Sequence, residues 1–438
     1  MPDARSLDLS TYAARIQQID PVPIYGQVVR VVGLVVESEG PPARVGDVCE
    51  LRNDDGGRLA MEVVGFRDGH MLAVPLGDTT GIRPGNRVAL RAGSSSMPVG
   101  EGVLGRVIDG MGQPIDGKGP IAVQAAAPLR PGALNPLARE PITQAVSTGV
   151  RAIDGLLTCG RGQRIGLFGG SGVGKSTLLG MMARGTEADI VVLALVGERG
   201  REVRSFLEQD LGQAGLERSV VVVSTSDSPP LVRLRAAYGA TTIAEHFRAQ
   251  GKNVLLMMDS VTRFAMAQRE VGLAAGEPPT AKGYPPSVFA LLPGLLERAG
   301  SLRSGGSITA FYSVLVEGDD TNEPIADAVR GILDGHIVLS RDLAARNHYP
   351  AIDILQSVSR TMPEVTVPEH RDKAGQVREW LAVLRDSEDL VSVGAYVAGS
   401  NPRIDAALAR RDAIERFLCQ PPDTSCGLAD AVSALREL

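Results

Sequence analysis

A glycine-rich octapeptide is the segment with the most specific chemistry. Residues 169–176 read GGSGVGKS and match the phosphate-binding pattern GxxxxGK[ST]. Its glycines let backbone N–H groups approach a polyphosphate, and a helix that begins near Lys175 would point its positive end at the anion. In this pattern Lys175 reaches the β- and γ-phosphates, and the hydroxyl of Ser176 is a ligand for Mg²⁺. The predicted nucleotide contacts are Gly169, Gly170, Ser171, Gly172, Val173, Gly174, Lys175, Ser176 and Thr177.

Two carboxylates follow apolar runs that are typical of buried strands. Asp259 comes directly after residues 254–258, where it would hold a Mg²⁺-bound water at the carboxyl edge of an α/β sheet. Glu198 follows residues 190–196, where a carboxylate can orient and polarise the water that attacks a γ-phosphate. The alternatives are an aspartate that caps a strand and a solvated charged loop around Glu198. The glycine-rich loop favours the metal role of Asp259, while the residues alone leave the role of Glu198 open.

The elements that must position these side chains form an α/β region between about residues 94 and 363. Its apolar runs do not alternate with polar residues, which is typical of parallel strands buried on both faces. Helical patterns separate several of the runs, so right-handed crossovers around a covered sheet are predicted. The predicted strands are residues 165–168, 190–196, 220–223, 254–258 and 308–316, and the predicted helices include residues 175–184, 203–214 and 231–250.

Different patterns flank this region. Short apolar runs separated by turn clusters predict a small β-barrel over residues 24–93, with strands at 28–36, 61–64, 71–76 and 87–90. Beyond Pro363 the sequence is helical, and the Pro421-Pro422 pair is expected to end the last clear helix. A short amphipathic segment ahead of the barrel is predicted by the helical spacing of Leu9, Tyr12, Ile16 and Ile19.

The composition excludes several classes of protein. The 438 residues are 44% hydrophobic and 22% charged, which excludes a mainly disordered chain. A net charge of −6 makes broad binding to nucleic acid a poor hypothesis. The four cysteines show no CxxC spacing, which argues against a zinc ribbon or a disulfide scaffold. The sequence shows no signal-peptide core and no apolar stretch of the ~18 residues that a spanning helix needs, so the expected location is the cytoplasm.

Several segments, taken in order, resemble the hexameric ATPases of type III protein export. They read GGSGVGKST, VGERGREVRSF, LLMMDSVTRFAMAQRE, GYPPSVFALLPGLLERAG, VEGDD, ILDGHIVLSR and NHYPAIDILQSVSR. The resemblance runs from about residue 20 to about residue 420 without large insertions, and through it the chain is similar to the catalytic subunit of rotary ATP synthases. The wording of segments such as TSDSPPL and FAMAQRE is more similar to the flagellar ATPases than to their injectisome counterparts.

The resemblance implies a RecA-like α/β P-loop NTPase core with an N-terminal small β-barrel and a C-terminal helical domain. The implied divisions are a partner-binding helix at residues 1–20, the barrel at 21–93, the ATPase domain at 94–363 and the helical domain at 364–438. The implied activity is ATP hydrolysis with Mg²⁺ at the subunit interfaces of a homohexameric ring, which energises flagellar protein export. Injectisome export is the alternative.

The resemblance also implies roles for single residues. Glu198 matches the catalytic carboxylate, and Arg199 matches a neighbouring arginine on the nucleotide. Asp259 matches the magnesium aspartate, and Arg263 matches an arginine that supports the site.

Two further matched residues lie late in the ATPase region. Tyr349 matches an aromatic that packs against adenine, and Arg360 matches an arginine finger that reaches the γ-phosphate of the adjacent subunit. A rigid guanidinium fork suits charge that spreads over transferring phosphoryl oxygens. The alternatives are an ordinary core residue at Tyr349 and a surface ion pair at Arg360.

The partners implied by the resemblance are other copies of the chain, a regulatory, stator-like protein at the N-terminus and a coiled-coil stalk in the central pore. The resemblance also implies the export gate, chaperones and export substrates as partners, and it implies no nucleic acid. The chain is expected to associate peripherally with the inner-membrane export apparatus. The N-terminal segment can alternatively lie on its own barrel.

Three other functions share the nucleotide core. They are a hexameric RNA translocase, a non-catalytic nucleotide-binding subunit and a catalytic subunit of a proton-coupled synthase. The barrel region offers Tyr25 and Phe66 but no ladder of aromatic and basic residues, which argues against RNA binding. The intact Lys175, Glu198 and Asp259 argue against a non-catalytic subunit.

Overall fold

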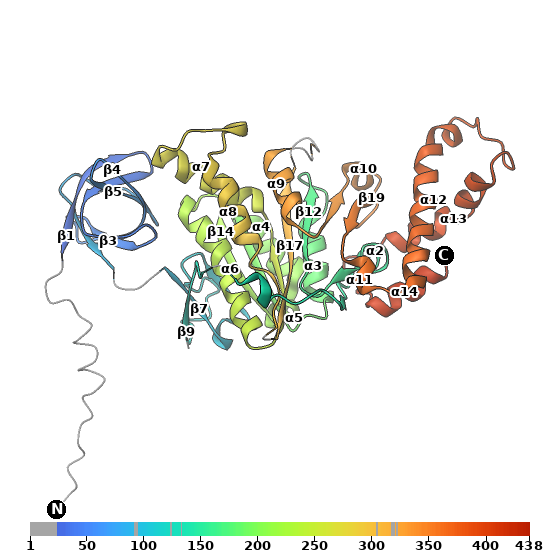
Figure 1. The fold of residues 1–438 in the computed structure, drawn as a ribbon, viewed down its shortest axis with the longest axis horizontal. Coiled ribbons are helices and arrows are strands. Elements are labelled where there is room, and N and C mark those ends of the chain that lie inside the picture. Colours follow the sequence, from blue (N-terminus) through green and yellow to red (C-terminus); the bar gives the residue numbers. More distant parts are fainter. Residues whose placement is uncertain are drawn as a thin grey trace, which may run out of the picture. The chain divides into compact units, whose positions relative to one another are not determined.

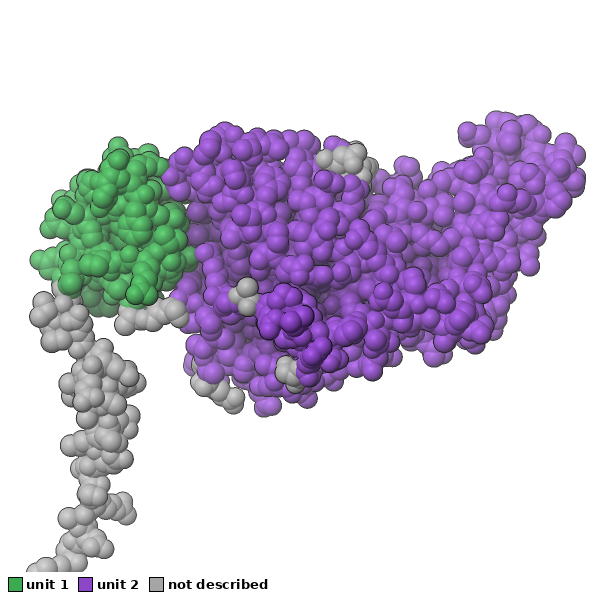
Figure 2. All heavy atoms as spheres, in the orientation of Figure 1, with its two compact units in different colours: residues 1–94 green, residues 95–438 purple. Residues whose placement is uncertain are grey.

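The computed structural model describes residues 24–91, 95–122, 125–132, 134–303, 305–316, 320 and 323–438 (Figure 1). The chain divides into two compact units, residues 1–94 and 95–438, which are coloured separately in Figure 2. The amphipathic segment predicted between Leu9 and Ile19 lies outside the described residues. Among the described residues, no helix is long and apolar enough to span a membrane.

The first unit contains a closed six-stranded β-barrel, as predicted. The strands are β1 (Tyr25–Val32), β2 (Val35–Glu39), β3 (Val48–Arg52), β4 (Arg58–Arg67), β5 (His70–Pro75) and β6 (Arg87–Leu90), and they close in the order β1-β2-β5-β4-β3-β6. The prediction of one strand over residues 28–36 was wrong. The chain reverses at Gly33, whose φ of 56° favours glycine, and β1 and β2 pair as an antiparallel hairpin.

The second unit is built on a mostly parallel sheet with the order β19-β18-β12-β17-β15-β13-β14-β8. All five strands predicted from apolar runs are present in it. The strands are β8 (Arg106–Asp109), β12 (Arg164–Gly169), β13 (Ile190–Glu198), β14 (Ser219–Thr225), β15 (Asn253–Met258), β17 (Ser307–Leu315), β18 (Gly335–Leu339) and β19 (Ile352–Ser359). β19 pairs antiparallel with β18 at one edge, whereas β8 pairs parallel with β14 at the other.

Helices cover this sheet and place turns at the carboxyl ends of its strands (Figure 1). They are α3 (Lys175–Gly185), α6 (Pro230–Ala249), α7 (Val261–Ala275), α8 (Pro286–Leu296), α9 (Pro324–Ile332) and α10 (Arg341–Ala345). The single helix predicted over residues 203–214 is instead three consecutive pieces, α4 (Gly200–Ser205), a π-helical segment (Phe206–Leu211) and α5 (Gly212–Glu217). π-Helical turns occur mostly as single turns inside α-helices, so a helical pattern alone does not distinguish them.

The C-terminal helices share the core of the nucleotide-binding region. They are α12 (Pro368–Ser392), α13 (Pro402–Leu418) and α14 (Leu428–Arg436). Trp380, Phe417 and Leu435 belong to the same buried cluster as Leu167 of β12. The expectation that the Pro421-Pro422 pair follows the last helix was wrong, because α14 begins after that pair.

Several hydrogen bonds join the end of α13 to the nucleotide-binding region through the short helix α2 (Arg151–Leu156). The guanidinium of Arg151 donates to the carbonyls of Arg416, Phe417 and Cys419 at the end of α13. The buried Gln420 accepts from the backbone N–H of Arg151 at 2.8 Å. Its own backbone N–H donates to the carbonyl of Tyr349 at 2.9 Å. We call this set of contacts the α2–α13 tie.

Candidate functional site

The phosphate-binding loop joins the carboxyl end of β12 to the first turn of α3, in the context that its sequence predicts. β12 ends at Gly169, and α3 begins at Lys175. Gly172 and Gly174 have φ values of 82° and 85°, a left-handed conformation in which glycine avoids the strain of a side chain. Gly174 is also the N-cap of α3, so the free N–H groups of this helix face the loop.

A buried ion pair joins the loop to the neighbouring end of β15. Nζ of Lys175 lies 2.7 Å from Oδ1 of Asp259 and donates to the Asp259 carbonyl at 3.1 Å. Burial opposes the charged form of Lys175, but the carboxylates of Asp259 and Glu198 outweigh burial and raise its pKa. Lys175 is therefore held as an ammonium group at the position where a phosphate would bind.

Glu198 is the last residue of β13 and faces the same pocket. The pocket is lined by Ser176, Glu198, Glu202 and Asp259 together with apolar side chains. Burial, the charge of Asp259 and a hydrogen bond to Asp259 raise the pKa of Glu198 to about 8. Glu198 therefore lies inside the pocket beside Asp259 rather than in a solvated loop.

Ser176 and Asp259 together fit a magnesium site. Oδ1 of Asp259 is buried and accepts no hydrogen bond of normal geometry from the described residues, although it lies beside Lys175. Ser176 lines the same pocket and contributes the kind of hydroxyl ligand that Mg²⁺ accepts. These oxygen donors match the preference of Mg²⁺.

The two arginines predicted beside the pocket differ in their surroundings. The side chain of Arg263 packs against Gly197, since a Cβ built on Gly197 would lie 2.9 Å from Cβ of Arg263. Arg263 therefore contacts the carboxyl end of β13. Arg199 instead pairs with Glu202 at 2.9 Å and is 66% exposed. Its side chain is turned to solvent.

Tyr349 lies beside the phosphate-binding loop, far from it in sequence. A Cβ built on Gly174 would lie 3.3 Å from two carbons of the Tyr349 ring, and this side chain is 37% exposed. The ring is thus a partly open aromatic surface next to the loop rather than a buried core residue. The side chain of Thr177, also predicted to contact nucleotide, lies near Asp210, where it opposes the rise that burial causes in the pKa of that carboxyl.

Arg341, to which no sequence pattern pointed, also lies at the loop. A Cβ built on Gly170 would come within 2.4 Å of the Arg341 guanidinium, so this cation lies directly over the loop backbone. Arg341 is the last residue of the segment ILDGHIVLSR. Arg341 follows the carboxyl end of β18, which pairs with β12, the strand that leads into the loop. Recognising β18 in the sequence would therefore have placed Arg341 near the loop.

Arg360 lies at the opposite end of the sheet from the loop. Leu339 pairs with Gly169 at the loop end of β18, whereas Ser359, just before Arg360, pairs with Gly335 at the other end. About 13 Å of strand separates these two ends at ~3.3 Å per residue. Arg360 is exposed and donates to the Leu333 carbonyl at 3.3 Å. It is therefore directed away from the loop of its own chain.

Family models match most of the chain. The nucleotide-binding domain of the ATP synthase alpha/beta family matches residues 149–359, and the β-barrel domain of that family matches residues 28–90. The T3SS EscN ATPase C-terminal domain matches residues 366–437.

Individual relatives agree with these models. The flagellum-specific ATP synthase of Bacillus subtilis is 52% identical over 431 residues, which is 97% of each chain. The type 3 secretion system ATPase of Xanthomonas euvesicatoria is 54% identical over 400 residues, covering 91% of this chain and 90% of the relative. The assembled ATPase EscN of the enteropathogenic E. coli type III secretion system superposes with a TM-score of 0.89 at 46% identity, covering 94% of this chain and 99% of that chain. The chain belongs to the type III protein-export ATPases within the ATP synthase alpha/beta family, and it is an ATPase.

Proposed function

We propose that this ATPase hydrolyses ATP·Mg²⁺ at the seams of a homohexameric ring and energises flagellar protein export. The observation that carries the proposal is the separation of Arg360 from the loop of its own chain. A buried Lys175, Asp259 and Glu198 cluster provides one half of a phosphoryl-transfer site, and a finger from a neighbour would provide the other. EscN, the similar ATPase solved in assembled form, supports the ring.

Each residue has a distinct part in the proposed reaction. The loop N–H groups and Lys175 bind the phosphates, with Arg341 over the loop backbone. Ser176 and Asp259 would hold Mg²⁺, which would supply neutralisation of phosphate charge. Glu198 orients and polarises the attacking water. Arg263 packs against Gly197, the residue before Glu198. Arg360 of the adjacent subunit stabilises the charge of the transition state, a contribution of ~10³–10⁵ in rate for such fingers.

Turnover is expected to depend on assembly, and this dependence tests the proposal. The rate per chain should rise steeply with protein concentration over the range in which light scattering reports ring formation, because a lone chain lacks the finger. An Arg360→Ala variant should assemble over the same range without the rise in rate. A rate per chain that stays constant down to concentrations with only monomers would contradict a shared site.

Tyr349 is proposed to stack on the adenine. Tyr349→Ala should weaken ATP binding roughly tenfold or more, since base–aromatic stacking contributes about 1–3 kcal/mol per base. Tyr349→Phe, which keeps the ring, should bind ATP nearly as the parent does. The measurement is the dissociation constant for ATP, with inorganic tripolyphosphate as the control ligand that has no base. An equal loss of tripolyphosphate binding would assign Tyr349 to the loop structure instead.

The export system served by the chain is proposed to be flagellar, with injectisome export as the alternative. Flagellum-specific relatives from Bacillus subtilis, Pseudomonas aeruginosa and Salmonella typhimurium are 52%, 52% and 49% identical. The Xanthomonas secretion ATPase, at 54%, keeps the alternative open. Loss of motility in a strain that lacks the chain would support the flagellar assignment, and loss of effector secretion alone would support the other.

The remaining partners are also part of the proposal. A coiled-coil stalk in the pore is supported by the solved complex of EscN with its central stalk EscO. A stator-like regulator is proposed to bind residues 1–20, ahead of a barrel (21–93), an ATPase domain (94–363) and a helical domain (364–438). Unchanged regulator binding after deletion of residues 1–18 would remove the N-terminal site. The export gate, chaperones and substrates would be met at the membrane apparatus from the cytoplasm.

A further inference from the structure

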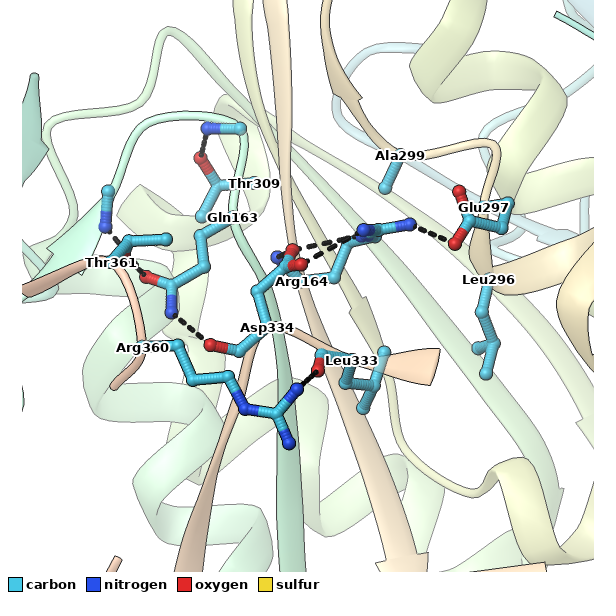
Figure 3. Close-up of polar contacts among 12 residues, drawn as sticks. Gln163, Arg164, Leu296, Glu297, Ala299, Thr309, Leu333, Asp334, Arg360 and Thr361 are labelled. Carbon is cyan, nitrogen blue, oxygen red and sulfur yellow. Dashed lines mark hydrogen bonds and ion pairs between the residues drawn. The ribbon is translucent and has the colours of Figure 1, made fainter. Parts of the chain in front are cut away.

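The backbone around Arg360 is held by hydrogen bonds to the turn before β18. The N–H of Arg360 donates to the Asp334 carbonyl at 3.0 Å, and Nη1 donates to the Leu333 carbonyl at 3.3 Å. Figure 3 shows the contact of the guanidinium with Leu333; the residue is exposed, whereas its main chain is fixed. The direction in which this side chain leaves the protein therefore depends on what fixes Ser359, Asp334 and Thr361.

Gln163 contacts all three of these residues, and Figure 3 shows its contacts with Asp334 and Thr361. Its Nε2 donates to the Asp334 carbonyl and to Oγ of Ser359, both at 3.1 Å. Its Oε1 accepts from the hydroxyl of Thr361 at 2.6 Å and from the N–H of Gly160 at 2.8 Å. The side chain is fully buried, and both donors and both acceptor sites of the amide are used.

A second contact fixes the same turn from the other side. Arg164, next to Gln163, binds the carboxylate of Asp334 through Nε and Nη2, each at 2.9 Å. Arg164 also pairs with Glu297, just after α8, as Figure 3 shows. Asp334 is therefore clamped at its carboxylate by Arg164 and at its carbonyl by Gln163. Both residues lie at the end of β12 that is opposite to the phosphate-binding loop.

We propose that Gln163 is the positioning residue for the arginine finger, so that it acts on hydrolysis in the adjacent subunit and not in its own. The inference rests on the proposed role of Arg360. The buried amide of Gln163 contacts Ser359 and Thr361, on either side of Arg360. It also binds the Asp334 carbonyl that accepts from the Arg360 N–H. These contacts fix the backbone position from which the Arg360 side chain extends. A displacement of about 1 Å in such a group costs ~10²-fold in rate.

The test is Gln163→Leu, which removes four hydrogen bonds while keeping an apolar side chain of similar size. We expect kcat to fall roughly tenfold or more, with KM for ATP changed less than about twofold, since the nucleotide-binding side of the chain is untouched. Gln268→Leu is the matched control, because Gln268 is also buried but bonds to Ser287 on another helix. This control should keep its turnover.

Mixed rings separate positioning from general damage. Gln163→Leu mixed with Lys175→Ala should regain activity, because the first chain supplies an intact loop and the second an intact finger. Gln163→Leu mixed with Arg360→Ala should not, because both chains lack a working finger. No recovery with Lys175→Ala, or recovery with Arg360→Ala, would overturn the proposal.

Two further comparisons distinguish a failure of the finger from a failure of its positioning by Gln163. The mixture of Arg360→Ala with Lys175→Ala is run alongside, and its failure to recover would remove the finger itself rather than only its positioning. Thr361→Val deletes one hydroxyl donor to Gln163 and carries the same mixing test if Gln163→Leu does not fold. Its defect should be smaller, with the same pattern of recovery. The opposite pattern would count against Gln163.

Discussion

Replacing Glu198 with glutamine is expected to leave ATP bound and to lower kcat by ~10²–10⁴-fold, the range of a lost general base. Binding should survive because Lys175 and the loop N–H groups, which are proposed to bind the phosphates, stay in place. Glutamine has nearly the same size as glutamate. It cannot accept a proton from the attacking water, so the chemical step alone should slow.

The measurement is a pair of experiments on the same preparation, ATP affinity at equilibrium and hydrolysis in a single turnover. Glu208→Gln is a suitable control, since Glu208 pairs with Arg204 on the surface at 2.8 Å. This control should hydrolyse ATP at the parent rate. Substantial turnover by Glu198→Gln would remove Glu198 from its proposed role.

Mixing two inactive variants, Arg360→Ala and Lys175→Ala, is expected to restore activity. Each variant alone should lose ~10³-fold or more, because each lacks a group that contacts transferring phosphate. In a random mixture, roughly a quarter of the seams in a ring with head-to-tail contacts combine an intact loop with an intact finger. A finger that acts in trans predicts this pattern, and Arg360 follows the residue that pairs at the far end of β18 from the loop.

The control for this mixture is subunit exchange, measured by fluorescence transfer between labelled chains. Activity should appear with the same time course as exchange. Exchange without any recovery would mean that Arg360 acts within its own chain or has no part in catalysis.

The central sheet could be predicted from the sequence because its strands are buried on both faces. β13 is buried from Ile190 to Gly197, and such a run has no polar alternation to obscure it. β19 could not be recognised in this way, because it lies at the edge and alternates buried and exposed residues near its end. β8, with four residues, is too short for any periodicity. The proline pair at 421–422 marked the end of α13 but carried no information about α14.

The parts of the candidate site that a backbone motif defines could be predicted from the sequence. The direction in which single side chains point could not. The phosphate-binding loop and Asp259 follow from glycine spacing and from a strand end. The segment GERGRE contains only charged residues and glycine, so its letters cannot say which side chain enters the pocket. Successive side chains of an extended chain point to opposite sides. Glu198, the last residue of β13, points into the pocket, and the extended Arg199 that follows points to solvent.

The α2–α13 tie has a thermodynamic consequence. The carbonyl of Tyr349 is bonded to the residue that anchors the end of α13, so the C-terminal helices cannot shift without a force on the ring beside Gly174. With Tyr349 stacked on the adenine, as proposed, a protein that binds α12 or α13 and favours one arrangement of them would change the affinity for the base. By reciprocity, ATP would then change the affinity for that protein by the same factor.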